Sequence, residues 1–370
     1  MTVSAVDRLY LRSAIRLAEK GLFSVTTNNP RVGCLLVKSG HIIGQGWHRE
    51  DGGPHAEIDA LRNTIEDPRG STAYISLEPC CWEGRTPACT TALIAAGIAR
   101  TVIAARDPHP RVAGGGVRAL LDAGIEVTEE NLSEETDALN PGLLMRGENN
   151  RPFVRLKTAI SIDGRTAMAN GQSRWITGEE SRADVQYWRA RSAAIITGVG
   201  TVIADDPKLN VRDQRFGNAK PLRVVVDTRG RTPRDAALFG EKGRIAIACA
   251  KGVESINRAE MWEQQGGPAI DLAMLLETLS DQGCNEVLVE AGATLNASFL
   301  GQGLWDEMIV YIAPRLMGDT ARPLAALGFT GMDEAISTTV KSIDTLGPDL
   351  RIVLTPVSHT HQTQPTNREV

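Results

Sequence analysis

The sequence lacks long apolar segments. It contains no run of about 18 apolar residues, the length that a membrane-spanning helix needs. Its first residues, MTVSAVDRLYLRS, also lack the apolar core of a secretory signal, because Asp7 and Arg8 interrupt it. We therefore expect a cytoplasmic protein with no membrane partner. With 370 residues, of which 42% are hydrophobic and 23% charged, the chain is long enough for about two domains with separate cores.

Basic clusters and disulfide patterns are scarce as well. The formal net charge is -5, and neither a long Lys/Arg block nor a basic, aromatic-rich groove motif occurs, which argues against nucleic acid as the main ligand. Six cysteines in 370 residues do not make a disulfide framework, and a cysteine cluster near a histidine and a glutamate more often binds metal. Three of them, Cys34, Cys249 and Cys284, lie in apolar surroundings that predict small buried side chains.

Helix and strand patterns alternate along the first part of the chain. Helices are expected near 5–20, 55–63, 89–96 and 115–124, and strands within 31–47 (a hairpin turned at 38–40) and near 73–77, 100–105 and 125–128. Strands separated by short helices predict a layered α/β domain with a largely parallel sheet. This unit ends near residue 148.

A polar, turn-rich segment at 146–152, RGENNRP, separates this unit from a second α/β series. Short apolar runs, typical of strands buried on both faces, follow at 153–161, 192–198, 222–227, 244–250, 286–292 and 307–314. We expect domains at 1–148 and 149–358 and a disordered tail at 359–370. His359 and His361 lie in that tail, where we expect no metal role. No internal repeat relates the halves, and a homo-oligomer is compatible with the sequence.

A candidate metal centre lies in the first half. His55, Cys80 and Cys89 offer one nitrogen and two sulfurs, a set that suits tetrahedral Zn²⁺ and leaves a fourth position for water. Glu57 can take a proton from that water, whose pKa zinc lowers to about 7, and deliver it to a substrate nitrogen. His55 and Cys89 each stand where a helix begins, so both helix starts can face one ion. Cys81 competes as a ligand, but adjacent residues rarely reach one metal together, and we favour Cys89.

The order His-x-Glu, then Pro-Cys and a second Cys, is the signature of zinc nucleobase deaminases, although eight residues separate the two cysteines here instead of two. A deaminase acting on nucleic acid through an appended binding module is the alternative function. A non-catalytic zinc scaffold is a third reading, which the presence of Glu57 opposes. Of the remaining histidines, His41, His48 and His109 are expected on the surface or in packing positions.

The wider motif set resembles the bifunctional deaminase/reductase family of riboflavin biosynthesis, over about residues 6–355. In the first half it comprises NPRVGCLLV, PHAE and EPCCWEGRTPAC. In the second half it comprises KTAISIDGRTA, SRWIT, GVGTVIADDPKLNVR and VEAGATLNASFL. The resemblance implies a cytidine-deaminase-like domain followed by a dihydrofolate-reductase-like domain, both α/β.

The resemblance also implies the chemistry. The first domain would hydrolyse the 2-amino group of 2,5-diamino-6-ribosylamino-4(3H)-pyrimidinone 5′-phosphate with zinc. The second would reduce the ribosyl side chain to ribityl with NADPH, giving 5-amino-6-(5-phosphoribitylamino)uracil. Hydride transfer needs orientation more than a protein nucleophile, and the second half offers neither a Ser/His/Asp arrangement nor a named acid.

The family positions carry over residue by residue. Zinc would be held by His55, Cys80 and Cys89, with Glu57 moving protons and Asn29 contacting the pyrimidine. NADPH would contact Ala159, Trp175, Thr201, Asp205, Thr228, Gly292, Ala293, Thr294, Leu295, Asn296, Ala297 and Ser298. The phosphorylated substrate would contact Ser173, Arg189, Leu209, Arg212 and Glu290.

Simpler readings exist for several of these residues. Trp175 could be core, Arg189 a solvated helix charge, and Leu209 a packing residue that meets substrate through its backbone. Lys157 is a further candidate ligand for sugar or phosphate. Cys81-Trp82 stands where the family commonly has Ser-His, which changes one expected substrate contact and not the metal.

Overall fold

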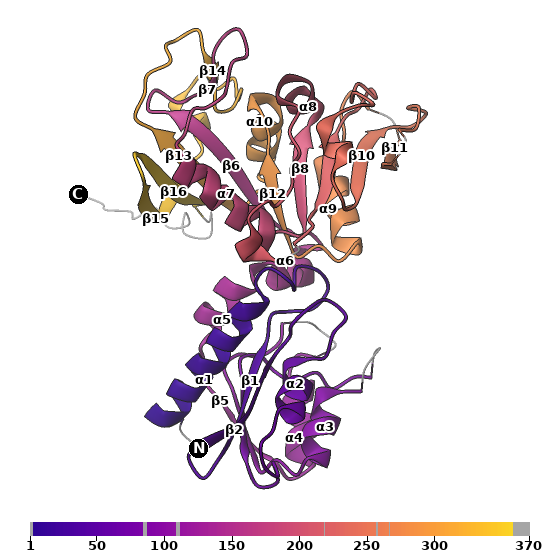
Figure 1. The fold of residues 1–370 in the computed structure, drawn as a ribbon, viewed down its shortest axis with the longest axis vertical. Coiled ribbons are helices and arrows are strands. Elements are labelled where there is room, and N and C mark those ends of the chain that lie inside the picture. Colours follow the sequence, from indigo (N-terminus) through magenta and orange to yellow (C-terminus); the bar gives the residue numbers. More distant parts are fainter. Residues whose placement is uncertain are drawn as a thin grey trace, which may run out of the picture.

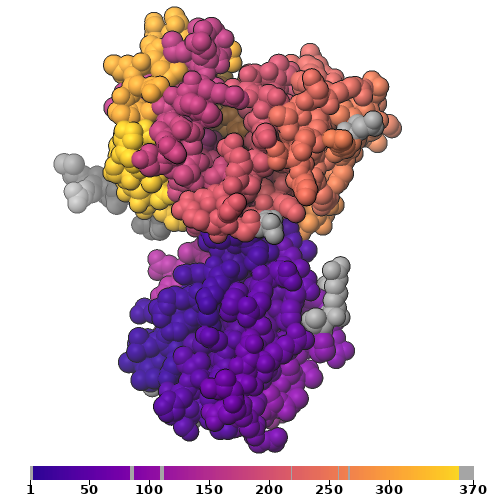
Figure 2. Space-filling model, viewed as in Figure 1, coloured from indigo at the N-terminus to yellow at the C-terminus, as the bar shows by residue number. Residues whose placement is uncertain are grey.

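The computed structural model describes residues 3–83, 87–108, 112–217, 219–256, 258–265 and 267–357. The expected tail at 359–370, with His359 and His361, and the expectation for His109 lie outside the described residues. Two lobes are joined by a narrow waist near helix α6 (Pro141–Asn149) (Figures 1 and 2). Among the described residues, no helix combines the length and apolar content needed to cross a membrane.

The N-terminal lobe is built on a five-stranded sheet of order β2-β1-β3-β4-β5. The strands are β1 (Gly33–Lys38), β2 (His41–Trp47), β3 (Thr72–Ile75), β4 (Arg100–Ile103) and β5 (Glu126–Glu129). Strand β1 pairs antiparallel with both β2 and β3, whereas β3 pairs parallel with β4 and β4 with β5, so β1 alone runs against the other four strands of the predicted, largely parallel sheet. The physical reason is the β1–β2 hairpin, whose short turn can join only antiparallel strands.

Helices cover both faces of this sheet (Figure 1). Helix α1 (Ala5–Ala18) begins at a capping box of Ser4 and Asp7, and its Leu11 and Ile15 pack on one face against Leu35 of β1. The opposite face of β1, through Leu36, packs against α2 (Ala56–Arg62), α3 (Cys89–Ala95) and α4 (Gly115–Asp122). The 3₁₀ turn η1 (Glu19–Gly21) follows α1, and α5 (Ser133–Leu139) precedes α6.

The C-terminal lobe contains a nine-stranded sheet of order β11-β10-β9-β8-β12-β6-β13-β16-β15. It is parallel from β11 to β13, and β16 and β15 are antiparallel. The strands are β6 (Phe153–Ser161), β8 (Ala194–Gly198), β9 (Leu222–Val226), β10 (Ile245–Ala250), β11 (Glu260–Gln264), β12 (Glu286–Glu290), β13 (Glu307–Ala313), β15 (Thr338–Leu346) and β16 (Asp349–Pro356). Short strands β7 (Arg165–Ala167) and β14 (Arg322–Pro323) form a separate ribbon.

Six strands of this sheet, β6, β8, β9, β10, β12 and β13, are buried on both faces, as their apolar runs predicted. Val287 and Val289 of β12 pack with α9 (Leu272–Asp281) and α10 (Ala293–Gly301), whereas Leu288 between them packs with α7 (Glu179–Arg191) on the other face. Helix α8 (Val199–Asp205) packs on β9 and β10, on the same face of the sheet as α7. Three further 3₁₀ turns are η2 (Gln214–Phe216), η3 (Ala237–Gly240) and η4 (Met332–Glu334).

The segment between the lobes differs from its prediction. Residues 146–149 belong to α6, which begins with Pro141 and ends at Asn149, and Asn150 closes it in a left-handed conformation (φ 50°). The polar side chains that suggested a turn lie at the C-terminal end of this helix, where residues 147–149 are exposed. The turn itself is therefore confined to the few residues before β6.

Candidate active sites

Three ligand atoms of the N-terminal lobe converge on one point. His55 is the N-cap residue of α2, Cys89 is the first residue of α3, and Cys80 lies on the loop after β3. His55 Nδ1 lies 3.2 Å from Cys89 Sγ and 3.5 Å from Cys80 Sγ, and the two sulfurs are 3.3 Å apart. Tetrahedral Zn²⁺, with bonds of about 2.3 Å to sulfur and about 2.0 Å to nitrogen, separates its ligand atoms by about 3.5–3.8 Å. The residues therefore fit a zinc ion.

The charges of the two thiols also fit a cation. Hydrogen bonding from Cys89, opposed by burial and aided by His55, lowers the pKa of Cys80 to about 4. The same contact with Cys80, together with burial, raises the pKa of Cys89. A cation between the two sulfurs would offset the burial and the mutual repulsion that oppose ionisation of Cys89, and so favour two thiolates. The side chain of Cys81 points away from these ligand atoms and toward Gly115 of α4. A Cβ added to Gly115 would lie 2.7 Å from the Sγ of Cys81.

Glu57 lies in the first turn of α2, two residues from the ligand His55, and its side chain is buried, at 3% exposure. Burial raises the pKa of this carboxyl, against the opposing effect of His55. A carboxyl beside a metal site with a pKa moved toward neutrality is suited to both accepting and donating a proton.

A histidine that sequence reasoning assigned to the surface or to packing joins this site. His48 is 2% exposed, and its ring meets that of His55 edge to face, with centroids 5.6 Å apart. Its Nδ1 lies 2.8 Å from the carbonyl oxygen of Pro54, which can only accept, so Nδ1 carries the proton. Its Nε2 is left to accept from the side-chain amide of Asn29 at 3.2 Å. Its position at the end of β2, next to the loop that leads to His55, is the signal that could have identified it.

Glu78, of the Glu-Pro-Cys motif, was also missed. Its carboxylate accepts hydrogen bonds at 3.0 Å from the backbone N–H groups of both Gly114 and Val117, where α4 begins. A carboxylate at a helix N-terminus satisfies donors that have no partner inside the helix. Glu78 therefore fixes the loop that carries Cys80 against α4.

The C-terminal lobe contains a cleft of about 1200 Å³. The ends of β8, β9 and β12 and the middle of β6 line it, together with the starts of α8 and α10. Figure 2 shows this lobe hollowed between its magenta and red-orange parts. Most of the predicted reductase residues line the cleft: Lys157, Ala159, Ser173, Trp175, Arg189, Thr201, Asp205, Leu209, Arg212, Thr228, Glu290, Gly292, Ala293, Thr294, Leu295 and Ser298.

Asn296 and Ala297 are not among the lining residues. Asn296 has no exposed surface, and its amide donates to the carbonyl oxygen of Ala291 at 3.2 Å. The prediction took residues 292–298 as one continuous block. Successive side chains of a helix point in different directions, so they cannot all face the cleft. The structure therefore gives Asn296 the task of anchoring the start of α10.

Two of the lining residues of the cleft, Arg189 and Glu290, form an ion pair. Arg189 contacts both carboxylate oxygens of Glu290, at 2.6 and 2.9 Å, and donates to the carbonyl oxygen of Asn210 at 3.0 Å. Burial opposes ionisation of Glu290, but Arg189 outweighs it and holds the pKa of this carboxyl below its usual value. Burial also lowers the pKa of the nearby Lys157 ammonium. The reading of Arg189 as a solvated helix charge is wrong.

The structure also shows the surroundings of the other predicted cleft residues. Trp175 is 60% exposed, so it is not a core residue. Leu209 is 2% exposed, so its side chain is packed in the interior. Its backbone lines the cleft in a left-handed conformation (φ 48°). Ser173 donates to Asp205 Oδ1 at 2.9 Å. Arg212 is exposed at the rim, where its charge acts on Glu290.

The start of α10 offers an anion site in this cleft. Gly292 is its N-cap, and the N–H groups of the following first-turn residues have no partner within the helix. Such N–H groups and the helix dipole favour phosphate. A cleft lined by the N–H groups of a helix start and by an ion pair suits a phosphate-bearing dinucleotide and a polar substrate.

The fold and the two sites define a two-domain enzyme in which a zinc-dependent deaminase precedes a reductase. Residues 4–105 match the family model of the cytidine and deoxycytidylate deaminase zinc-binding region, and residues 152–352 match that of the RibD C-terminal domain. The chain belongs to the RibD family of riboflavin biosynthesis proteins. It is a bifunctional deaminase and reductase that uses Zn²⁺ and NADPH and acts on a small pyrimidine substrate.

The relatives match nearly the whole chain. The riboflavin biosynthesis protein RibD of Haemophilus influenzae is 41% identical over 95% of this chain and 98% of its own. That of Escherichia coli is 42% identical over 93% and 98%. The solved structure of Acinetobacter baumannii RibD is 43% identical, with a TM-score of 0.88 over 95% of this chain and 99% of its own. These matches disfavour a nucleic-acid deaminase with a binding module, and the enzyme class excludes a passive zinc scaffold.

Proposed function

We propose that the chain performs two consecutive steps on one pyrimidine phosphate. A solved relative from Thermotoga maritima, 31% identical with a TM-score of 0.85, is described as a diaminohydroxyphosphoribosylaminopyrimidine deaminase and 5-amino-6-(5-phosphoribosylamino)uracil reductase. The corresponding substrate here is 2,5-diamino-6-ribosylamino-4(3H)-pyrimidinone 5′-phosphate. The convergence of His55, Cys80 and Cys89 beside buried Glu57 is the observation that carries the proposal.

In the deamination, water replaces the 2-amino group, which leaves as ammonia. Zinc, when bound, makes a water available as hydroxide at neutral pH. Glu57 accepts one proton of that water and passes it to the ring nitrogen, and it then moves the second proton, from the hydroxyl group added to the carbon, to the amine that leaves as ammonia. Asn29 and His48, which contact each other at 3.2 Å, hold the pyrimidine ring beside the ligands.

In the reduction, the bond between the ring oxygen and the sugar carbon that bears the amine breaks, a hydride moves from NADPH to that carbon, and a proton from solvent goes to the oxygen, which converts the ribosyl group to ribityl. The start of α10 binds a phosphate of the dinucleotide, and Trp175 and Thr228 line the same cleft. The Arg189–Glu290 pair orients the sugar hydroxyls, and Arg212 at the rim attracts the 5′-phosphate. The task of these residues is orientation, which can supply much of the rate of such a step.

The two steps are assigned to separate domains, at 1–148 and 149–358. The test is incubation of the purified protein with the diaminopyrimidinone phosphate, with and without NADPH, followed by product mass. Without NADPH we expect exchange of one amino group for oxygen, with release of ammonia. With NADPH we expect two further hydrogens. An unchanged substrate mass under both conditions contradicts the proposal.

A further inference from the structure

The two lobes are joined by backbone pairing at a particular loop of the deaminase domain. The N–H of Asn28 donates to the carbonyl oxygen of Gly283 at 2.8 Å, and the N–H of Asn285 donates to that of Thr26 at 3.3 Å. Between these bonds, Thr27 and Cys284 form an antiparallel bridge. A short piece of antiparallel ladder thus connects the loop at 26–31 to the segment that enters β12.

The side chain of Asn285 continues this pairing. Its amide nitrogen donates to the carbonyl oxygen of Asn29 at 3.2 Å, and its oxygen accepts from Arg146 of α6 at 2.7 Å. Asn285 is 6% exposed, and Gly142 of α6 approaches it so closely that an added Cβ would lie 2.0 Å from its carbonyl oxygen. Both ends of the Asn285 amide therefore have fixed partners in a closely packed junction.

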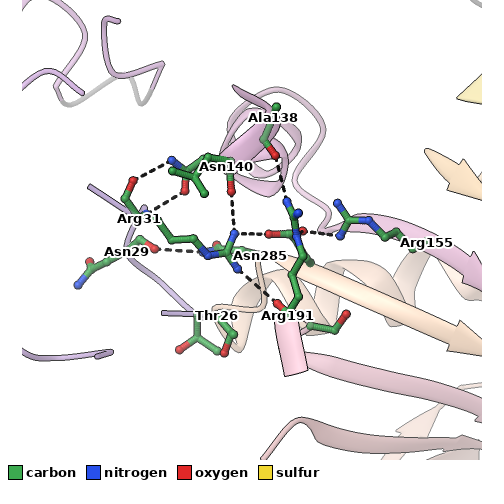
Figure 3. A network of polar contacts seen from close by, with 12 residues as sticks. Thr26, Asn29, Arg31, Ala138, Asn140, Arg155, Arg191 and Asn285 are labelled. Carbon is green, nitrogen blue, oxygen red and sulfur yellow. Dashed lines mark hydrogen bonds and ion pairs between the residues drawn. The ribbon is translucent and has the colours of Figure 1, made fainter. Parts of the chain in front are cut away.

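The next residues along both segments are fixed as well (Figure 3). Arg31 forms an ion pair with Glu286, whose carboxylate also binds Arg155 and, at 2.8 Å, Arg191. Asn140 accepts from the backbone N–H of Arg31 at 2.8 Å and donates to its carbonyl oxygen at 3.0 Å. Asn29 is thus held between anchored neighbours, which keeps its side chain directed at His48.

We propose that Asn285, a residue of the reductase domain, is a positioning residue of the deaminase site. The inference rests on the proposed role of Asn29 as a pyrimidine contact. Asn285 directly precedes β12, and the last residue of this strand, Glu290, lies in the reductase cleft. The six-residue segment 285–290 therefore serves both sites: Asn285, just before the strand, serves the deaminase, and Glu290, the last residue of the strand, serves the reductase.

The expected effect is on substrate binding. Asn29 contacts the pyrimidine before and during the reaction alike, so losing its fixed position raises KM more than it lowers kcat. If a carboxylate replaces the amide of Asn285, the buried carbonyl oxygen of Asn29 loses its hydrogen-bond donor and faces a negatively charged oxygen. The free energy of this loss is enough to shift substrate binding by about tenfold. The zinc ligands and the reductase cleft do not contact Asn285 and keep their geometry.

The test uses two variants of the full-length holoenzyme that remove opposite ends of the same amide interaction. Asn285→Asp keeps the acceptor for Arg146 but replaces the donor to Asn29 with an acceptor. Arg146→Met removes the partner of the oxygen and leaves the donor to Asn29. We expect Asn285→Asp to raise the deaminase KM about tenfold, with kcat within about threefold. Zinc content, reductase KM and all constants of Arg146→Met should stay within about twofold.

Three outcomes overturn the inference: an unchanged deaminase KM in Asn285→Asp, an equal loss of both activities in that variant, or an equal rise of KM in Arg146→Met. Asn29→Ala separates this failure from failure of the proposed function. If Asn29→Ala raises the deaminase KM and Asn285→Asp does not, only the positioning role is wrong. If Asn29→Ala has no effect either, the assignment of Asn29 itself is wrong.

Discussion

The zinc centre and the reductase cleft are organised in opposite ways. The zinc centre concentrates its chemistry in three ligand atoms within 4.8 Å of one another and one buried carboxyl, all held by two helix starts and one loop. The cleft distributes recognition over about 1200 Å³ along four strands, with one ion pair and backbone N–H groups among its lining. A concentrated site should fail when a single residue changes, whereas a distributed site should lose affinity in steps. The predictions below test that difference.

The largest effect is expected for Glu57→Gln. The amide keeps the shape of the side chain but cannot accept a proton from water, and loss of general acid–base catalysis costs about 10²–10⁴ in rate. Ammonia release should fall by that factor, while zinc content and NADPH oxidation with deaminated substrate stay unchanged. Undiminished ammonia release by this variant contradicts the concentrated character of the site.

The junction should show a large effect on stability. Burial opposes ionisation of Glu286, but Arg191, Arg31 and Arg155 outweigh it, so its pKa lies below its usual value of about 4.5. A carboxyl with a lowered pKa contributes its stability fully above the unfolded-state pKa and loses it as pH falls toward the folded-state pKa. The free energy of unfolding should therefore decline below about pH 4.5.

Glu286→Gln should reduce this acid-dependent decline, because Glu286 is one of several carboxyls with a lowered pKa, and should at neutral pH lower the free energy of unfolding by about 3–5 kcal/mol, because it leaves buried arginines unpaired. Chemical denaturation across a pH series measures both effects. Glu260→Gln is the control, since Glu260 pairs with Arg244 on the surface, where both side chains are more than 40% exposed, and should cost far less. Equal losses in the two variants contradict the role of the buried network.

A smaller effect is expected at the cleft rim. Arg212→Ala should raise the reductase KM for the phosphorylated substrate by about 10- to 150-fold, the usual cost of losing a hydrogen bond to a charged group. NADPH affinity should change little. Arg215→Ala is the matched control, because Arg215 is nearby and exposed but pairs with Asp213 and lies outside the cleft lining. If Arg212→Ala weakens NADPH binding as much as substrate binding, the assignment of Arg212 to the substrate phosphate is wrong.

The smallest effect is expected from removing the whole deaminase domain. A fragment that begins at Asn149 keeps every strand of the nine-stranded sheet, the complete cleft lining, and Arg155 and Arg191 as partners of Glu286. It should bind NADPH with nearly unchanged affinity and contain no zinc. Isothermal titration measures the affinity, and a soluble, folded fragment that does not bind NADPH shows that the cleft depends on the first domain.

The same contrast explains what could be predicted from sequence. The zinc ligands were identified because histidine and cysteine side chains are diagnostic for the metal and lie within 35 positions of one another. Runs such as 222–227 predicted strands correctly because strands buried on both faces are continuously apolar. Strand β15 was missed because it lies at the sheet edge with most residues exposed and has no such run.

Other features had no local signal. The hydrogen bond between Asn29 and Asn285 joins residues 256 positions apart, and nothing in either sequence neighbourhood indicates the partner. His48 offered only a weak signal, its position between the predicted hairpin and His55, and it is the fold that brings its ring edge to face with that of His55. The cleft residues were found through the resemblance of whole motifs, because backbone N–H groups carry no residue identity. That is also why Asn296 and Ala297 were included with their neighbours.

The central claim is that two chemically independent sites share this chain, and Cys80→Ser tests it most directly. Zinc per chain should be measured by elemental analysis, alongside ammonia release and NADPH oxidation on the same sample. We predict one zinc per wild-type chain, loss of zinc and of ammonia release in the variant, and a reductase rate equal to that of the wild type. Full zinc occupancy in the variant, or a reductase that fails together with the deaminase, contradicts the account.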